Sequence, residues 1–129
     1  MSKPKVAFYW CACCGGCDEA VLDLAEGVLD VVEAVDIVFW PVALDFKESD
    51  VEAMEDGSIA VTFINGSVRD SHHREMAHLL RRKSQTVVAF GSCAHMGGVP
   101  GLANGFSLES MLQAVYGDTP PQPRSRVNG

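Results

Sequence analysis

The chain alternates short apolar runs with loops and helical patterns, and this alternation constrains its fold more than any other feature. The runs have the length and composition of buried strands, and they cover residues 6–10, 36–40, 59–64 and 86–90. Helical patterns separate them: one opens at Asp18 and continues to Val32, and another runs from Ser67 or Asp70 to about Lys83. Such alternation predicts an α/β fold with a doubly wound parallel sheet.

The rest of the chain is less regular. Residues 43–57 are polar and predict a loop with a short helix, and a last short helix runs from Ser107 or Glu109 to Val115. Residues 1–117 are long enough to form a single domain with a buried core. Residues 118–129 are rich in proline and polar side chains, so we expect a tail or a truncated linker there.

Four of the five cysteines lie within seven residues, directly after the first predicted strand. They are Cys11, Cys13, Cys14 and Cys17, whereas Cys93 lies in a glycine-rich loop after the fourth predicted strand. The carboxyl ends of parallel strands meet at one edge of a sheet, where ligands of such folds bind. We therefore expect Cys93 to lie on the same edge as the other four.

This cysteine pattern favours a metal or redox role. An odd, clustered set is a poor disulfide framework and suits a reducing compartment. Four-iron clusters are usually held by four cysteine thiolates. Zinc sites typically show two paired Cys-x-x-Cys units or added histidines, and the second pair is missing here. His95 lies two residues after Cys93, and we predict loop hydrogen bonding for it rather than a ligand role.

Two other functions stay open. Trp10-Cys11-Ala-Cys-Cys14 resembles the Trp-Cys-x-x-Cys of thioredoxin-like proteins, between a first strand and a helix. A thiol–disulfide oxidoreductase of this kind would leave Cys13, Cys17 and the glycine-rich loop of Cys93 without a role, which counts against it. The other alternative is an interaction or assembly module without a cluster. A flavin site is disfavoured because the first loop carries thiols where phosphate binding needs Ser or Thr and glycine amides.

The charge and the hydropathy pattern limit the partners. A formal charge of −7 argues against nucleic acid and anionic membranes. We find no signal peptide and no apolar stretch long enough to span a membrane. We therefore expect a cytoplasmic protein without membrane insertion.

Two motifs resemble a known superfamily. Cys14-Gly-Gly-Cys17-Asp-Glu19 resembles the Cys-x-Gly-Cys-x-Glu signature that opens the small subunit of nickel–iron hydrogenases. Phe90-Gly-Ser-Cys93-Ala, followed by Gly97-Gly-Val-Pro-Gly101, resembles the loop that carries the third ligand in that family.

Further stretches narrow this resemblance. The tandem Cys13-Cys14 is similar to the cluster-binding small subunit of respiratory NADH:quinone oxidoreductase. Residues 63–69 and 89–94 look closest to the cytoplasmic, F420-non-reducing (methyl-viologen-reducing) hydrogenase branch. The similarity spans about residues 5–118 and corresponds to the N-terminal domain of those subunits.

The resemblance implies a flavodoxin-like domain that carries a proximal [4Fe-4S] cluster, with Cys14, Cys17 and Cys93 as ligands. The cluster would pass electrons between a hydrogenase-type large catalytic subunit and further carriers, such as ferredoxin-like or heterodisulfide-reductase-type subunits. No catalytic centre would then lie on this chain alone. Glu19 stands where the family has a buried acidic residue at the subunit interface, which makes it a candidate for proton transfer. The alternative for Glu19 is a carboxylate favoured by the helix N-terminus.

The chain departs from the family pattern at the fourth ligand. The family supplies it from a later Gly-Cys-Pro-Pro, whereas this sequence has Thr119-Pro-Pro121 and no cysteine after Cys93. We expect a fragment that stops before that ligand. The alternative ligand is Cys11, because Cys11, Cys14 and Cys17 have the Cys-x-x-Cys-x-x-Cys spacing of bacterial ferredoxins.

Overall fold

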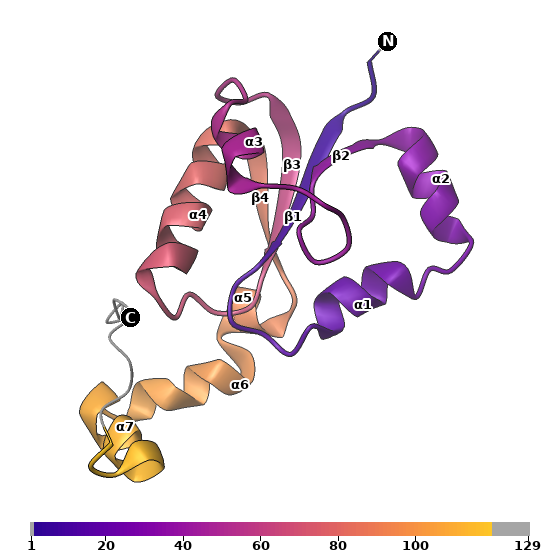
Figure 1. The fold of residues 1–129 in the computed structure, drawn as a ribbon. Helices are drawn as coiled ribbons and strands as arrows, with labels where there is room; N and C mark the ends of the chain where they lie inside the picture. Colours follow the sequence, from indigo (N-terminus) through magenta and orange to yellow (C-terminus); the bar gives the residue numbers. More distant parts are fainter. Residues whose placement is uncertain (1, 120–129) are drawn as a thin grey trace.

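The computed structural model describes residues 2–119, and its centre is a four-stranded sheet (Figure 1). All neighbouring strands are parallel, in the order β2-β1-β3-β4. The strands are β1 (Lys5–Trp10), β2 (Asp36–Phe39), β3 (Ile59–Asn65) and β4 (Ser84–Phe90). This sheet confirms the predicted doubly wound α/β class. Of the predicted tail at 118–129, residues 120–129 lie outside the described residues.

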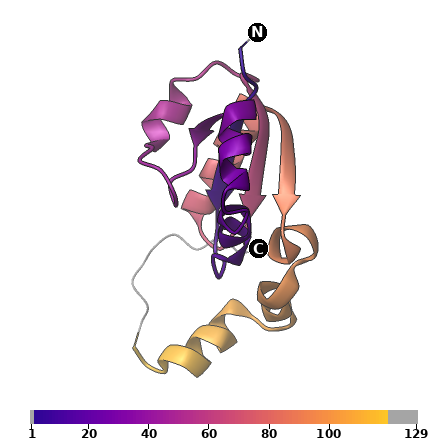
Figure 2. The same ribbon diagram turned by 90° about the vertical axis from the view of Figure 1, so that its right-hand side faces the viewer.

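Helices cover both faces of the sheet (Figures 1 and 2). One face carries α1 (Gly16–Leu22) and α2 (Gly27–Ala34), and the other carries α3 (Glu48–Glu52) and α4 (Ser71–Lys83). The chain steps from β1 to β2 in one direction and from β2 across to β3 and β4 in the other. Because such crossovers are right-handed, the reversal moves the helices to the opposite face. The reversal also makes the carboxyl ends of β1 and β3 the switch point, where ligands of this fold class bind.

The core has one part on each face of the sheet. Successive residues of a strand point to opposite faces, and those of β1 divide accordingly. Tyr9 and Cys11 pack with residues of α3 and α4, whereas Phe8 packs with Trp40 and Phe63 on the other face. Phe8 lies between the two, with ring centroids 4.6 Å from Trp40 and 5.1 Å from Phe63. The core under α1 and α2 therefore contains a cluster of three aromatic rings.

The prediction of one helix from Asp18 to Val32 is wrong, because the chain breaks into α1 and α2. Between them, Ala25 has a positive φ of 48°, and the amide of Ala25 bonds to the carbonyl of Leu22, three residues back. Helix α2 then begins at Gly27. Glycine is unfavourable inside a helix. The spacing of apolar residues hid the break because several of them, including Leu24 and Leu29, are exposed here rather than buried.

The predicted second helix agrees closely with α4. Of the two proposed caps, Asp70 is the N-cap, and its carboxylate accepts the amide of His73 at 2.8 Å. The three basic residues Arg81, Arg82 and Lys83 occupy the last turn, where the helix dipole favours positive charge.

The residues after β4 form an arm that leaves the carboxyl edge of the sheet (Figure 1, orange to yellow). We call residues 92–116 the C-terminal arm. It contains α5 (Ser92–Met96), α6 (Gly98–Gly101), η1 (Leu102–Gly105) and α7 (Leu108–Tyr116). Large apolar side chains are exposed along it, namely Met96, Val99, Leu102, Phe106, Val115 and Tyr116. Within residues 2–119, no helix has the length and apolar character needed to cross a membrane.

Candidate metal centre

The loop that carries four cysteines is fastened to the end of β3. The amide of Cys11 donates to the carbonyl of Asn65 at 2.7 Å. One residue on, Ala12 and Ser67 exchange two backbone hydrogen bonds of 3.0 and 2.9 Å and form an isolated antiparallel bridge. Gly66 lies against this bridge, and a Cβ there would be 2.8 Å from the carbonyl oxygen of Ala12. The cysteine loop is thus fixed at the switch point of the sheet.

The loop then turns into α1 at Gly15 and Gly16. The amide of Gly15 donates to the sulfur of Cys13 at 3.3 Å. Cys14 is exposed, and Cys17 is half-buried in the first turn of the helix. Two of the three predicted ligands therefore lie on either side of the start of α1.

Cys17 is also in contact with the loop that follows β4. Its sulfur lies 3.9 Å from the carbonyl oxygen of Phe90. A Cβ at Gly91 would lie 2.3 Å from the same sulfur, so only a glycine admits this approach. Cys93 follows two residues later and is half-buried. The two cysteine-bearing loops meet at one edge of the sheet, as the strand order predicted.

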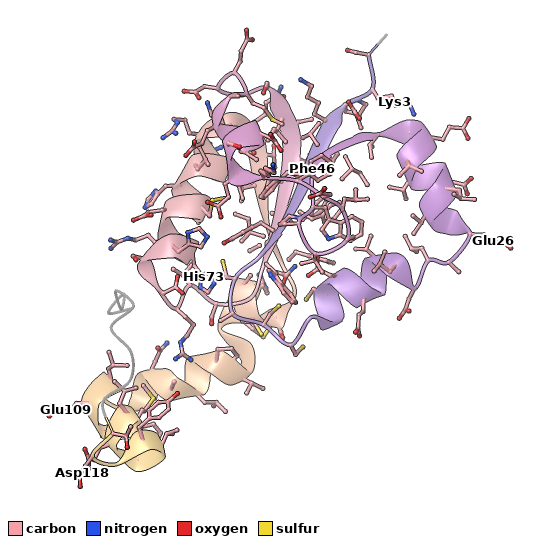
Figure 3. All side chains as sticks on the ribbon, viewed as in Figure 1. Lys3, Glu26, Phe46, His73, Glu109 and Asp118 are labelled. Carbon is pink, nitrogen blue, oxygen red and sulfur yellow. The ribbon has the colours of Figure 1, made fainter. Side chains whose placement is uncertain are left out.

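Figure 3 shows sulfur atoms, in yellow, where β1 and β4 give way to α1 and α5. Burial raises the pKa of Cys17, and the nearby Cys14, Cys93 and Asp18 raise it further. Cys17 is therefore within electrostatic reach of both other predicted ligands. Among residues 2–119, no group of three or more His, Cys, Asp and Glu side chains is arranged to hold a metal ion.

Cys13 is a further thiol close to the predicted ligands Cys14 and Cys17. Burial raises its pKa, the amide of Gly15 lowers it, and Asp18, Cys14 and Cys17 raise it. Its neighbours are thus the residues at the start of α1.

Cys11 is buried in the core, and of the other thiols only Cys13 is among the groups that shift its pKa. It is 5% exposed and packs on the face of the sheet that α3 and α4 cover. Burial raises its pKa to about 11, with smaller contributions from Cys13 and Asp70. A thioredoxin-like nucleophile needs a lowered pKa, so this environment counts against a dithiol of Cys11 and Cys14.

We predict that iodoacetamide modifies Cys14 first and Cys11 last in the folded, metal-free chain. At pH 8, a thiol with a pKa of about 11 is ionised to about one part in a thousand, and the thiolate is the reactive form. Mass mapping after timed alkylation measures the order. Alkylation in denaturant is the control, because it should remove the difference. Equal rates in the folded chain would contradict the placement of Cys11.

Sequence reasoning missed the buried carboxylate of Asp18, which directly follows Cys17. Asp18 is 2% exposed. Its Oδ1 accepts the indole N–H of Trp40 at 2.8 Å, and its Oδ2 accepts the amide Nδ2 of Asn65 at 3.0 Å. The sequence showed only an acidic residue at a helix start, since both partners come from the ends of other strands. Glu19, the predicted proton-transfer candidate, is exposed in this chain.

Comparisons with known proteins support a family assignment. The family described as NADH ubiquinone oxidoreductase, 20 Kd subunit, matches residues 14–124. The iron-sulfur subunit of the F420-non-reducing hydrogenase of Archaeoglobus profundus is 40% identical over 132 residues, which cover 95% of this chain and 41% of that protein. The delta subunit of the NAD-reducing hydrogenase HoxS of Cupriavidus necator is 29% identical, over 88% of this chain and 51% of that protein.

A solved structure agrees with these relatives. A chain in the crystal structure of NAD+-reducing [NiFe]-hydrogenase in the H2-reduced state superposes with a TM-score of 0.76 and 28% identity. That match covers 98% of this chain and 67% of the other. This chain spans about two fifths of the A. profundus subunit and 34% of an F420-non-reducing hydrogenase subunit of Methanococcus voltae that is 39% identical. The resemblance drawn from the cysteine motifs is confirmed, and the chain belongs to the family of the NADH ubiquinone oxidoreductase 20 kDa subunit.

Proposed function

We propose that this chain is an electron-transfer subunit that binds a [4Fe-4S] cluster through Cys14, Cys17 and Cys93. The observation that carries the proposal is the contact of the Cys17 sulfur with Gly91, two residues before Cys93. The donor set fits such a group in its chemistry, because cysteine thiolates are the usual ligands of iron–sulfur clusters. When bound, the cluster accepts and releases electrons one at a time. The name of the A. profundus relative, an iron-sulfur subunit, supports the same proposal.

The chain's own residues would hold the group at the switch point of the sheet. Helix α1 presents Cys17 from its first turn, and α5 presents Cys93 from the end of β4. Cations favour thiolates, so iron would overcome the raised pKa of Cys17.

The fourth ligand has two candidate sources. The greater length of the relatives supports a ligand from a longer chain. Of the two remaining cysteines, Cys13 lies near Cys14 and Cys17, whereas Cys11 lies in the core of the opposite face. Cys13 is therefore the better local candidate, and this replaces Cys11 in our proposal.

The proposed partner is a hydrogenase-type large catalytic subunit, which would hold the catalytic centre. The names of the A. profundus and C. necator relatives, both of them hydrogenase subunits, support this assignment. The exposed apolar side chains of the C-terminal arm are of the kind that partner subunits cover. Further electron carriers would be ferredoxin-like or heterodisulfide-reductase-type subunits. The proposed compartment is the cytoplasm. Glu19 stays a proposed proton-transfer residue, and it is accessible on α1 for that role.

Anaerobic reconstitution tests the cluster directly. The chain is incubated with iron, sulfide and thiol reductant and then desalted. We expect a brown protein with a broad visible absorbance, about four iron atoms per chain, and an EPR signal after reduction with dithionite. The control is the same incubation with zinc instead of iron. A colourless product that takes up zinc but retains no iron or sulfide would overturn the proposal.

A further inference from the structure

The carboxylate of Asp18 is the most deeply buried charged group beside the proposed cluster site. It follows Cys17 directly in the first turn of α1. Trp40, at the end of β2, and Asn65, at the end of β3, each donate one N–H to one of its two oxygens. An ionised carboxylate offers acceptors only, and each of its two oxygens here receives a donated N–H. In this form the side chain places a negative charge directly beside Cys17.

This charge has no paired cation in the described part of the chain. Among the ion pairs of residues 2–119, none joins Asp18 to a lysine, arginine or histidine. The two N–H donors stabilise the carboxylate but bring no net charge. A charge shielded from water acts on its neighbours through a low effective dielectric. Asp18 directly follows Cys17 in the first turn of α1, so this charge lies beside a proposed ligand.

We propose that Asp18 is a buried electrostatic determinant of the cluster's reduction potential and keeps that potential low. The inference rests on the proposed function. Reduction adds one electron to the cluster, taken from an external donor, and a fixed negative charge beside the ligands disfavours that addition.

The variant Asp18→Asn removes the negative charge but keeps the size and shape of the side chain. Its side-chain oxygen can still accept the indole N–H of Trp40. Its new amide then faces Asn65, whose Oδ1 is buried and has no hydrogen-bond partner among the described residues. If the Asn65 amide turns over, that oxygen accepts the new N–H. Both hydrogen bonds to residue 18 are then kept while the negative charge is lost, and the Asn65 Nδ2 takes the position that Oδ1 occupies without a partner in the wild type.

The test is a dithionite titration of the reconstituted chain, followed by EPR at pH 8. For Asp18→Asn we expect a higher reduction potential, by about 59 mV or more, which is a tenfold change in the reduced-to-oxidised ratio of a one-electron couple. Asp23→Asn is the matched control. It removes the same charge from an exposed position at the end of the same helix, so water should screen its effect and the shift should be small.

A second variant covers the case in which Asp18→Asn does not retain the cluster. Trp40→Phe keeps the carboxylate and removes one donor to it, so we expect the potential to fall. Unchanged potentials in both variants, or shifts in the same direction, would overturn the inference while leaving the proposed function intact. A wild-type chain that binds no cluster would overturn the proposed function and, with it, this inference. Thermal unfolding of the metal-free variants shows separately whether the fold has changed.

Discussion

Replacing Cys93 or Cys17 with serine should remove most of the iron that the reconstituted chain retains. The two residues come from different loops, which meet where the Cys17 sulfur lies against Gly91. Each substitution would therefore remove one thiolate ligand and leave the ligand of the other loop in place. Changes outside the ligand set of metal sites already cost about 10–100-fold in affinity, and the loss of a thiolate ligand should cost more. We therefore expect at least a tenfold drop in iron retained after desalting, measured by colorimetric iron and sulfide assays.

Cys11→Ala is the matched control for these variants. It also removes one thiol from the loop, but that thiol packs in the core under α3 and α4. We expect it to retain the cluster and to lose some stability instead. Iron loss in Cys11→Ala as large as in Cys93→Ser would show that the ferredoxin-like spacing of Cys11, Cys14 and Cys17 describes the site better. Normal iron content in Cys93→Ser would refute its assignment as a ligand.

The sheet and the meeting of the two cysteine loops could be predicted because both depend on short-range patterns. Each strand contains a run of mainly apolar residues, as expected in a parallel sheet that helices cover on both faces. Once the strands are parallel, their carboxyl ends must share an edge, and Cys17 and Cys93 follow two of those ends. Spacing along the chain was therefore sufficient to bring the two residues together.

The features that escaped prediction depend on which face a side chain occupies. Cys11 continues the alternating side-chain directions of β1, so it packs on the same face of the sheet as Tyr9. Cys17 instead lies in α1, with its sulfur against Gly91 after β4. The spacing of the cysteines in the loop alone allowed Cys11 to be a ligand of the same site as Cys14 and Cys17. Asp18 was missed for a related reason, because its partners Trp40 and Asn65 meet only when β2 and β3 are placed on either side of β1. Long-range pairings of this kind leave no local signal.

Gly66→Ala should strongly destabilise the fold at the site. Gly66 has a φ of +81°, which costs an L-residue about 1–2 kcal/mol. The added Cβ would also lie 2.8 Å from the carbonyl oxygen of Ala12 and 2.9 Å from its carbon. These are backbone atoms held by the two hydrogen bonds between Ala12 and Ser67, so they cannot move aside without breaking the bridge. We expect a total loss of about 3 kcal/mol in the free energy of unfolding.

Gly57→Ala isolates the conformational part of this loss. Gly57 has a φ of +72°, and a Cβ there would have no other atom within 4 Å. We expect a cost of about 1 kcal/mol for this control, measured for both variants by urea unfolding of the metal-free chain with a constant m-value. Equal losses in the two variants would mean that the backbone around Ala12 and Ser67 shifts at little cost to admit the new Cβ.

The larger loss in Gly66→Ala should be accompanied by weaker iron retention, because the bridge between Ala12 and Ser67 fixes the cysteine loop to the end of β3. Gly57→Ala, which leaves the bridge intact, should load iron like the wild type.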